Sequence, residues 1–261
     1  MVDSTLPVAA LGNSPLGEEG TRFARLRLLV TPLVLALVGI ALWIYVGTRT
    51  LDSIEARTLT SNAIIEATLQ HLKLTTVASI IVVLIAIPAG IVLTRARFAL
   101  LNPVVLGLAN VGQAAPALGV LVLLAMVFGV GQVIAIVALV ISAVLPVLRN
   151  TIVGIQQVDV SLVEAARGMG LKGHQVLRRV ELPLAVPIML AGLRTTIIIC
   201  VGVATLATFV DAGGTGGLIV TGIKTLRNPI LITGATLTLI IAFALDWLAS
   251  VAEHFARPKG L

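Results

Sequence analysis

Charged residues are scarce in this sequence: Asp, Glu, Lys and Arg together make up only 11% of its 261 residues. Aromatic residues make up 3%, whereas hydrophobic residues make up 58%, and the mean hydropathy is +1.10. A soluble domain carries about 25% charged residues, so this composition excludes an ordinary water-soluble globular protein. The apolar residues also fall in long blocks, as they do in membrane-spanning helices. The sequence therefore predicts a protein of the lipid bilayer.

The patterns that would indicate metal, redox or nucleotide chemistry are absent as well. The single cysteine, Cys200, excludes an intrachain disulfide and a cysteine-based metal cluster. The three histidines are scattered without ligand-like spacing, so we expect no metal site. The glycine-rich residues 211–217 lack the Gly-Lys-Ser/Thr ending of a phosphate-binding loop. We interpret them as a compact loop with closely packed backbone, and we expect no catalytic residue, no cofactor and no ATP site in this chain.

Six apolar blocks are long enough to cross a bilayer as helices, which takes about 20 residues each. They run roughly over residues 28–47, 72–94, 103–127, 131–148, 184–209 and 229–251. Only Gly129, Val130 and Gly131 separate the third block from the fourth, which predicts a tight hairpin. We therefore predict an all-α fold, a polytopic membrane helix bundle with six transmembrane helices.

The net charge of +6 is distributed in short basic clusters between the apolar blocks. A nucleic-acid-binding surface interleaves basic and aromatic residues, and no such surface is apparent, so we expect no nucleic-acid partner. In membrane proteins, Lys and Arg gather in the short cytoplasmic loops. Five fall on one side of the predicted spans and twelve on the other, namely Arg22, Arg25, Arg27, Arg95, Arg97, Arg149, Arg167, Lys172, Arg178, Arg179, Arg257 and Lys259. The twelve-residue side predicts a cytoplasmic location for both termini and for the loop 149–183.

That loop carries a helix-turn-helix pattern over residues 159–183. Ser161 and Glu164 have the spacing of a capping box, which predicts a helix that begins near Ser161. A narrow apolar stripe follows at helical spacing, and Gly170 is placed to end the helix; the stripe comprises Leu162, Ala165, Ala166 and Met169. A second short stripe precedes Pro183, which opens the next span. The small residues of the first helix permit close approach by a partner surface.

The same loop resembles the cytoplasmic signature of ABC importer permeases. That signature reads Glu-Ala-Ala, three residues, Gly, nine residues, Ile, any residue, Leu-Pro, and this chain has Val180 in the Ile position. The resemblance implies a type I ABC importer permease fold. It also implies a set of residues that couple the chain to an ATPase, namely Glu164, Ala165, Ala166, Gly168, Gly170, Leu182 and Pro183.

A finer resemblance covers nearly all of residues 70–225. The stretches 145–151, 165–170, 180–185 and 191–195 are similar to permeases for glycine betaine, choline or carnitine. This implies import of such an osmoprotectant, or of proline, across a bacterial cell membrane. The implied partners are a cytoplasmic ABC ATPase dimer that binds the ATP, a second permease subunit, identical or different, and an external substrate-binding protein.

The resemblance also implies how the chain is divided. The expected segments are a cytoplasmic N-terminal tail (1–27), a peripheral first helix (28–47), an external segment (48–71), a five-helix transport core (72–251) and a cytoplasmic C-terminal tail (252–261). The transport core includes the coupling loop 149–183.

Arg194 is a charge about eleven residues into the fifth span, so it should face the protein interior, a partner or water. It either lines the translocation path, where it meets a solute carboxylate, or belongs to a structural ion pair. Thr195 and Thr205 are further candidates for the path. Recognition of a quaternary ammonium group usually uses an aromatic cage. With 3% aromatic residues, we expect high-affinity recognition to reside in the external receptor.

Three alternatives remain open. A methionine-type ABC permease shares the signature loop. A secondary transporter usually has paired broken spans and intramembrane acids for ion coupling, which are not evident in the sequence. A channel subunit would not need the signature loop.

Overall fold

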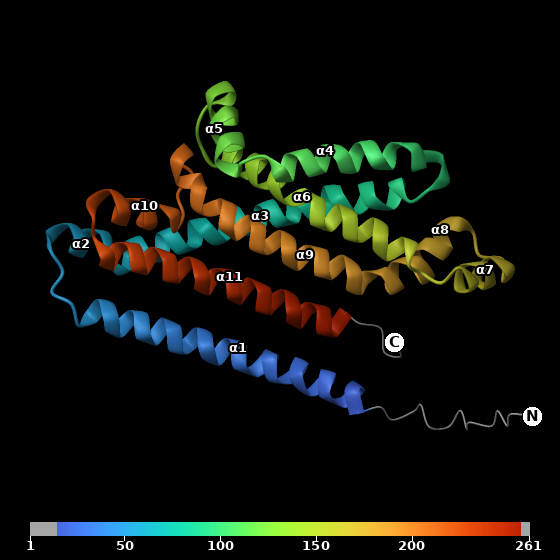
Figure 1. Ribbon diagram of the computed structural model, residues 1–261, viewed down its shortest axis with the longest axis horizontal. Coiled ribbons are helices and arrows are strands. Elements are labelled where there is room, and N and C mark those ends of the chain that lie inside the picture. The colour runs from blue at the N-terminus through green and yellow to red at the C-terminus, as the bar shows by residue number, and fades with distance from the viewer. Residues whose placement is uncertain (1–14, 257–261) are drawn as a thin grey trace, which may run out of the picture.

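The computed structural model describes residues 15–256, and every regular element within that range is helical. Most of the chain lies in seven long elements (Figure 1): α1 (Pro15–Gly47), α3 (Ser61–Leu93), α4 (Asn102–Ala114), α5 (Ala117–Phe128), α6 (Gln132–Gln156), α9 (Leu182–Ala204) and α11 (Asn228–Ala256). Shorter elements connect them: α2 (Ser53–Thr58), η2 (Ala96–Leu101), α7 (Val160–Gly168), α8 (Gly173–Val176), η3 (Leu177–Glu181), η4 (Thr205–Val210) and α10 (Gly216–Thr225).

Five of these helices are long and apolar enough to cross a membrane, and a sixth span requires α4 and α5 to count as one. The predicted third span is therefore not a single straight helix, because α4 and α5 are bent by 95° between Ala114 and Ala117. Pro116 explains the break: proline lacks the backbone N–H, and it forces the preceding residue out of the helical region. Ala115 accordingly has φ −62° and ψ 138°. The helix α5 runs across the direction of the other long helices (Figure 1) and packs against α6 and η4.

The core of the bundle is α6, which packs against α3 on one side and α9 on the other. Close helix packing in membranes depends on small residues, and two glycines show this directly. A methyl group added at Gly90 would lie 2.7 Å from Thr151, and one at Gly192 would lie 2.7 Å from Asn150 Nδ2. The backbones of α3 and α9 therefore approach α6 closely at these two glycines.

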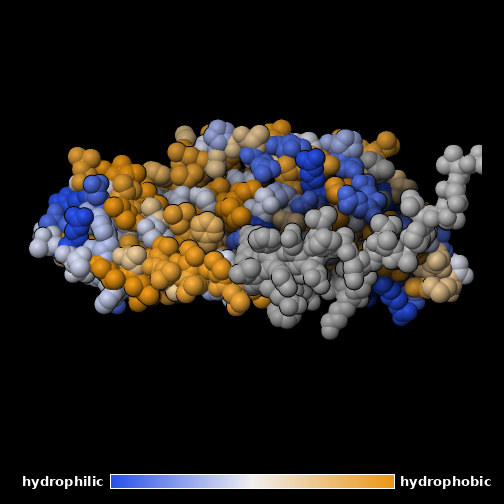
Figure 2. Space-filling model, turned by 60° about the horizontal axis from the view of Figure 1, so that its bottom comes forward, coloured by the Kyte–Doolittle hydropathy of each residue, from blue (hydrophilic) through white to orange (hydrophobic). Residues whose placement is uncertain are grey.

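The first helix, α1, lies at the edge of the bundle against α11 (Figure 1). No residue in its membrane-spanning part, Leu29–Gly47, is buried. Figure 2 shows apolar side chains between hydrophilic ones at the left-hand end and a second hydrophilic group toward the upper right. An apolar belt of this kind suits a bilayer.

The two ends of the bundle carry different elements. The start of α1, the end of α11, α7 and α8 lie at one end, whereas α2 and α10 lie at the other (Figure 1). The loop 149–183 therefore lies at the same end as the start of α1 and the end of α11 (Figure 1). Residues 1–14 and 257–261, which form most of the predicted tails, lie outside the described residues.

The glycine-rich loop before α10 is compact, as predicted. Gly213 and Gly214 have positive φ angles of +77° and +96°, which only glycine adopts without strain. The Gly214 N–H donates to Gln70 Oε1 of α3 at 3.0 Å. At Gly216 there is no room for a side chain, because a methyl group would meet the Thr205 carbonyl oxygen.

Candidate functional site

The short helix α7 begins at Val160, within one residue of the predicted start. Its N-terminal cap is not the predicted Ser161–Glu164 capping box. The Asp159 carboxylate instead accepts the Ser161 N–H at 2.8 Å, and the hydrogen bond holds the pKa of Asp159 below its usual value. Because Asp159 already occupies the Ser161 N–H, Glu164 has no capping role. The capping-box prediction was wrong, since an acidic residue two positions earlier competes for the same donor.

Most of the predicted coupling residues in α7 face outward. Glu164, Ala165 and Gly168 are exposed, and only Ala166 is buried. The predicted apolar stripe does not face the bundle either, because Leu162 is 48% exposed and Met169 is 76% exposed. A short helix that presents apolar and acidic side chains away from the bundle has a surface suited to another protein.

Gly170 ends the helix as predicted. Its φ is +83°, and the Leu171 N–H folds back to the Ala166 carbonyl at 3.2 Å. A methyl group built on Gly168 or Gly170 meets no atom within 4 Å, so the small residues leave open space at the surface.

The second predicted helix is not a separate element. Residues 173–210 form one continuous helical run, from α8 through η3 and α9 to η4. The segment η3 is a π-helical turn, in which the Leu182 N–H donates to the Leu177 carbonyl. Pro183 directly follows the π-helical turn and does not interrupt the run. The sequence predicted that one helix ends and the next begins at Pro183, whereas the structure has a continuous helix there.

The segment from α7 to η3, residues 160–181, is anchored to the bundle by buried apolar side chains. Val176 is 1% exposed, and the half-buried Leu182 packs against the buried Ile155, Ala185 and Met189. Pro183 is exposed beside it. The start of α9, directly after η3, is therefore packed against α6.

A buried ion pair also holds this element. Arg95 follows the end of α3, and its guanidinium binds both carboxylate oxygens of Glu181, the last residue of η3. The sequence analysis missed the pair, because the two residues are 86 positions apart and neither occupies a fixed position of the signature. Glu181 stands at its variable position, between Val180 and Leu182.

Arg194 does not stand alone in its span. Its guanidinium makes two parallel hydrogen bonds to Asp246, at 2.9 and 3.0 Å, and lies 3.4 Å from Glu253. Both acids lie on α11, so the cluster joins α9 to α11. Of the two interpretations of Arg194, the structural ion pair is the one with a geometric basis.

The other two path candidates lie elsewhere on the same helical run. Thr195 is exposed and donates to the Ala191 carbonyl at 3.2 Å. Thr205, at the start of η4, is half-buried and donates to the Gly202 carbonyl at 2.6 Å. The structure does not bring the three candidates into one cluster.

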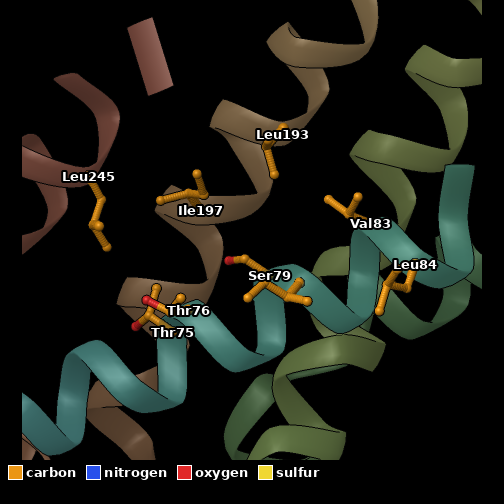
Figure 3. A pocket seen from close by; sticks show the side chains of 9 residues that line it. Thr75, Thr76, Ser79, Val83, Leu84, Leu193, Ile197 and Leu245 are labelled. Atoms are coloured by element: carbon orange, nitrogen blue, oxygen red, sulfur yellow. The ribbon is translucent and has the colours of Figure 1, made fainter. Parts of the chain in front are cut away.

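A cavity of about 290 Å³ lies between α3, α9 and α11 (Figure 3). The Thr75 and Ser79 hydroxyls at its wall are buried and lack a hydrogen-bond partner, apart from the weakly polar Cys200 thiol near Ser79. The sequence analysis also missed these hydroxyls, although His71, Thr75 and Ser79 recur every four residues in an apolar helix. That spacing predicts one buried polar stripe. No group of three or more potential metal ligands occurs within the described residues.

The architecture is thus a bundle of five or six candidate membrane spans with a short exposed helix, α7, at one end. The family model for the inner membrane component of binding-protein-dependent transport systems matches residues 86–257. The chain belongs to this family, so it is the permease component of an ABC importer, and ATP hydrolysis belongs to another subunit.

Curated relatives match most of the chain. The glycine betaine/carnitine/choline transport system permease protein OpuCB of Bacillus subtilis is 40% identical over 192 residues, which cover 74% of this chain and 88% of the relative. The choline transport system permease protein OpuBB of the same organism is 40% identical over 194 residues, with the same coverage of both chains. The osmoprotectant import permease protein OsmY of Salmonella typhimurium is 42% identical over 179 residues, which cover 69% of this chain and 76% of the relative.

Solved structures share the fold. An inward-facing structure of the MetNI methionine ABC transporter superposes with a TM-score of 0.66 and 23% identity, over 75% of this chain and 96% of that one. An amino acid ABC transporter crystallised with histidines gives a TM-score of 0.64 and 23% identity, over 79% of this chain and 100% of the other. At this identity the likeness concerns the fold alone.

Proposed function

We propose that this permease imports an osmoprotectant such as glycine betaine, choline, carnitine or proline. The observation that carries the proposal is the 40% identity to the glycine betaine/carnitine/choline permease over 192 residues. That match extends over most of the transport core, so it concerns the whole pathway rather than the coupling loop alone.

The proposed assembly has two permease subunits, two cytoplasmic ATPases and one external binding protein. The excess of Lys and Arg at the α7 end supports a cytoplasmic location for that end and for both termini. The five spans from α3 to α11 are the transport core, and α1 is an added peripheral helix whose exposed sides face lipid.

The mechanism is alternating access driven through residues 159–182. Closure of the ATPase dimer displaces α7 and α8, and the rod formed by α8, η3 and α9 transmits the movement into the bundle. The coupling residues divide into two groups. Glu164, Ala165, Gly168 and Gly170 meet the ATPase, whereas Ala166 and Leu182 hold the element to the bundle and Pro183 opens α9. The ATPase shifts the equilibrium only because it binds the two permease conformations with different affinity.

The translocation path itself needs little affinity for the solute. Thr195 and Thr205 offer hydroxyl groups along the path. Arg194 is already neutralised by two carboxylates, so its part is to keep α9 and α11 together beside the path. The chain has few aromatic residues for a quaternary ammonium cage, which assigns selection of the solute to the receptor.

The test is the ligand specificity of the binding protein encoded beside this permease. Purified receptor is titrated calorimetrically with glycine betaine, choline, carnitine, proline and methionine. We expect saturable binding of at least one of the first four. Binding of methionine alone would instead favour the methionine-type permease.

A further inference from the structure

The Arg95–Glu181 pair joins two elements that the coupling mechanism must move. Arg95 directly follows the C-cap of α3 at Thr94, and its own N–H is bound to the Val92 carbonyl at 3.0 Å. Glu181 ends the π-helical turn from which α9 continues. The pair therefore connects the end of α3 to the hinge between the exposed turn and α9.

The pair is buried on the carboxylate side. The Glu181 side chain is 7% exposed and that of Arg95 is 37% exposed. One of the two contacts, between Arg95 Nη1 and Glu181 Oε1, measures 3.3 Å. A carboxylate with so little access to water depends on its partner, because desolvating an unpaired charge is costly. Where Glu181 moves, Arg95 and the end of α3 must follow.

The π-helical turn gives this connection a mechanical meaning. Such turns are rare and occur often at functional sites, because the widened ring is a place where a helix can change its rotation. Without another contact, a displacement of α7 and α8 could be absorbed by a local change of twist in this turn, and it would then not reach α9. The ion pair at the last residue of the turn opposes this change of twist.

We propose that Arg95 and Glu181 are positioning residues that make α3 and α9 move as one unit when the ATPase displaces residues 159–182. The inference rests on the proposed coupling function, and it adds Arg95 and the variable position of the signature, Glu181, to the coupling path. It predicts that loss of the pair uncouples ATP hydrolysis from transport without preventing assembly.

The experiment compares four variants in vesicles that hold the complete complex of permease, ATPase and receptor. Glu181→Gln removes the charge, Arg95→Glu with Glu181→Arg exchanges the partners, and Arg95→Met with Glu181→Leu replaces the pair by apolar groups. Arg97→Gln is the matched control, because Arg97 is an exposed cation two residues from Arg95. The readouts are solute imported per ATP hydrolysed and the amount of assembled complex.

We expect Glu181→Gln to assemble but to import about five- to tenfold less solute per ATP. The exchanged pair should recover to within about twofold of wild type, since the attraction is restored. The apolar pair should assemble, because such replacements are often tolerated, yet couple as poorly as Glu181→Gln. The control should match wild type.

Two outcomes would overturn the inference. One is a wild-type ratio of solute to ATP in the apolar pair; the other is loss of the complex from the membrane in all three pair variants, which would make the pair purely structural. Failure of the proposed function is distinguishable, because the wild-type complex would then import none of the osmoprotectants.

Discussion

Arg194 of α9 and Asp246 of α11 face each other as a two-bond ion pair, with Nε–Oδ1 and Nη2–Oδ2 distances of 2.9 and 3.0 Å. Their side chains are only 22% and 13% exposed. A charge inside a membrane protein is tolerated where it is paired in this way. The pair explains how an arginine fits into an apolar span, and it fixes the contact between the two helices.

We expect Arg194→Leu to lower the free energy of unfolding by about 3 kcal/mol, because it removes the guanidinium that binds the largely buried carboxylates of Asp246 and Glu253. Arg194→Leu combined with Asp246→Leu should cost less than the single change. Denaturant unfolding of the purified subunit in detergent measures both. The exposed Asp52–Arg227 pair, at 2.7 Å, is the control, and Arg227→Leu should cost about 1 kcal/mol or less. A loss in Arg194→Leu no larger than the loss in Arg227→Leu would contradict a stabilising role for the Arg194 pair.

Gly170→Leu should abolish docking of the ATPase while the permease still inserts in the membrane. The leucine side chain has open space around it in the isolated chain, so it would occupy the surface offered to the partner. Gly129→Leu is a matched control, since Gly129 also has a positive φ, +89°, and open space, but lies between α5 and α6. Co-purification of the ATPase provides the measurement. Equal retention of the ATPase by both variants would contradict the docking role.

Glu164 is exposed and does not cap α7, so its contribution should be a charged contact with the ATPase. We expect Glu164→Gln and Glu164→Ala to weaken ATPase binding alike, by about tenfold, as loss of a charge-assisted hydrogen bond does. The difference from wild type should shrink at high salt. Binding titrations at two salt concentrations test this. A Glu164→Gln variant that binds the ATPase like wild type would contradict an ionic contact at this position.

The cap on α7 should depend on pH through Asp159. Its pKa lies below the ordinary value of 3.8 because the carboxylate accepts the Ser161 N–H. The stabilisation is therefore fully present above that ordinary value and is lost as the pH falls through the lower, folded value. Hydrogen exchange of the α7 amides, corrected for the intrinsic rate, should be constant from pH 8 to 5 and accelerate below about 4. In Asp159→Asn, which caps without a charge, this acceleration should be absent.

Local patterns predicted much of the fold. The length of the apolar blocks predicted the membrane spans. Gly170 predicted the end of α7, because a single glycine with a positive φ angle is enough to end a helix. Two predictions were wrong because of a single nearby residue. Pro116 bends a block that is mainly apolar, and the Asp159 carboxylate accepts the Ser161 N–H that the Ser161–Glu164 capping box would use.

The ion pairs lay beyond the sequence for a different reason. Arg95 meets Glu181 across 86 positions, and Arg194 meets Asp246 across 52. The sequence around each of these residues does not indicate which residue it will contact, because the contacts form only when the helices pack. The signature predicts which element couples to an ATPase, whereas only packing shows what holds that element to the bundle.

Transport by the reconstituted complex tests the central claim most directly. Vesicles containing the permease and its ATPase are supplied with the receptor and labelled glycine betaine, choline or carnitine. The account predicts uptake that requires ATP, requires the receptor, is competed by other quaternary ammonium solutes and is lost in Gly170→Leu but not in Gly129→Leu. Uptake that ignores these solutes while a common amino acid is imported, or uptake that proceeds without ATP, would contradict it.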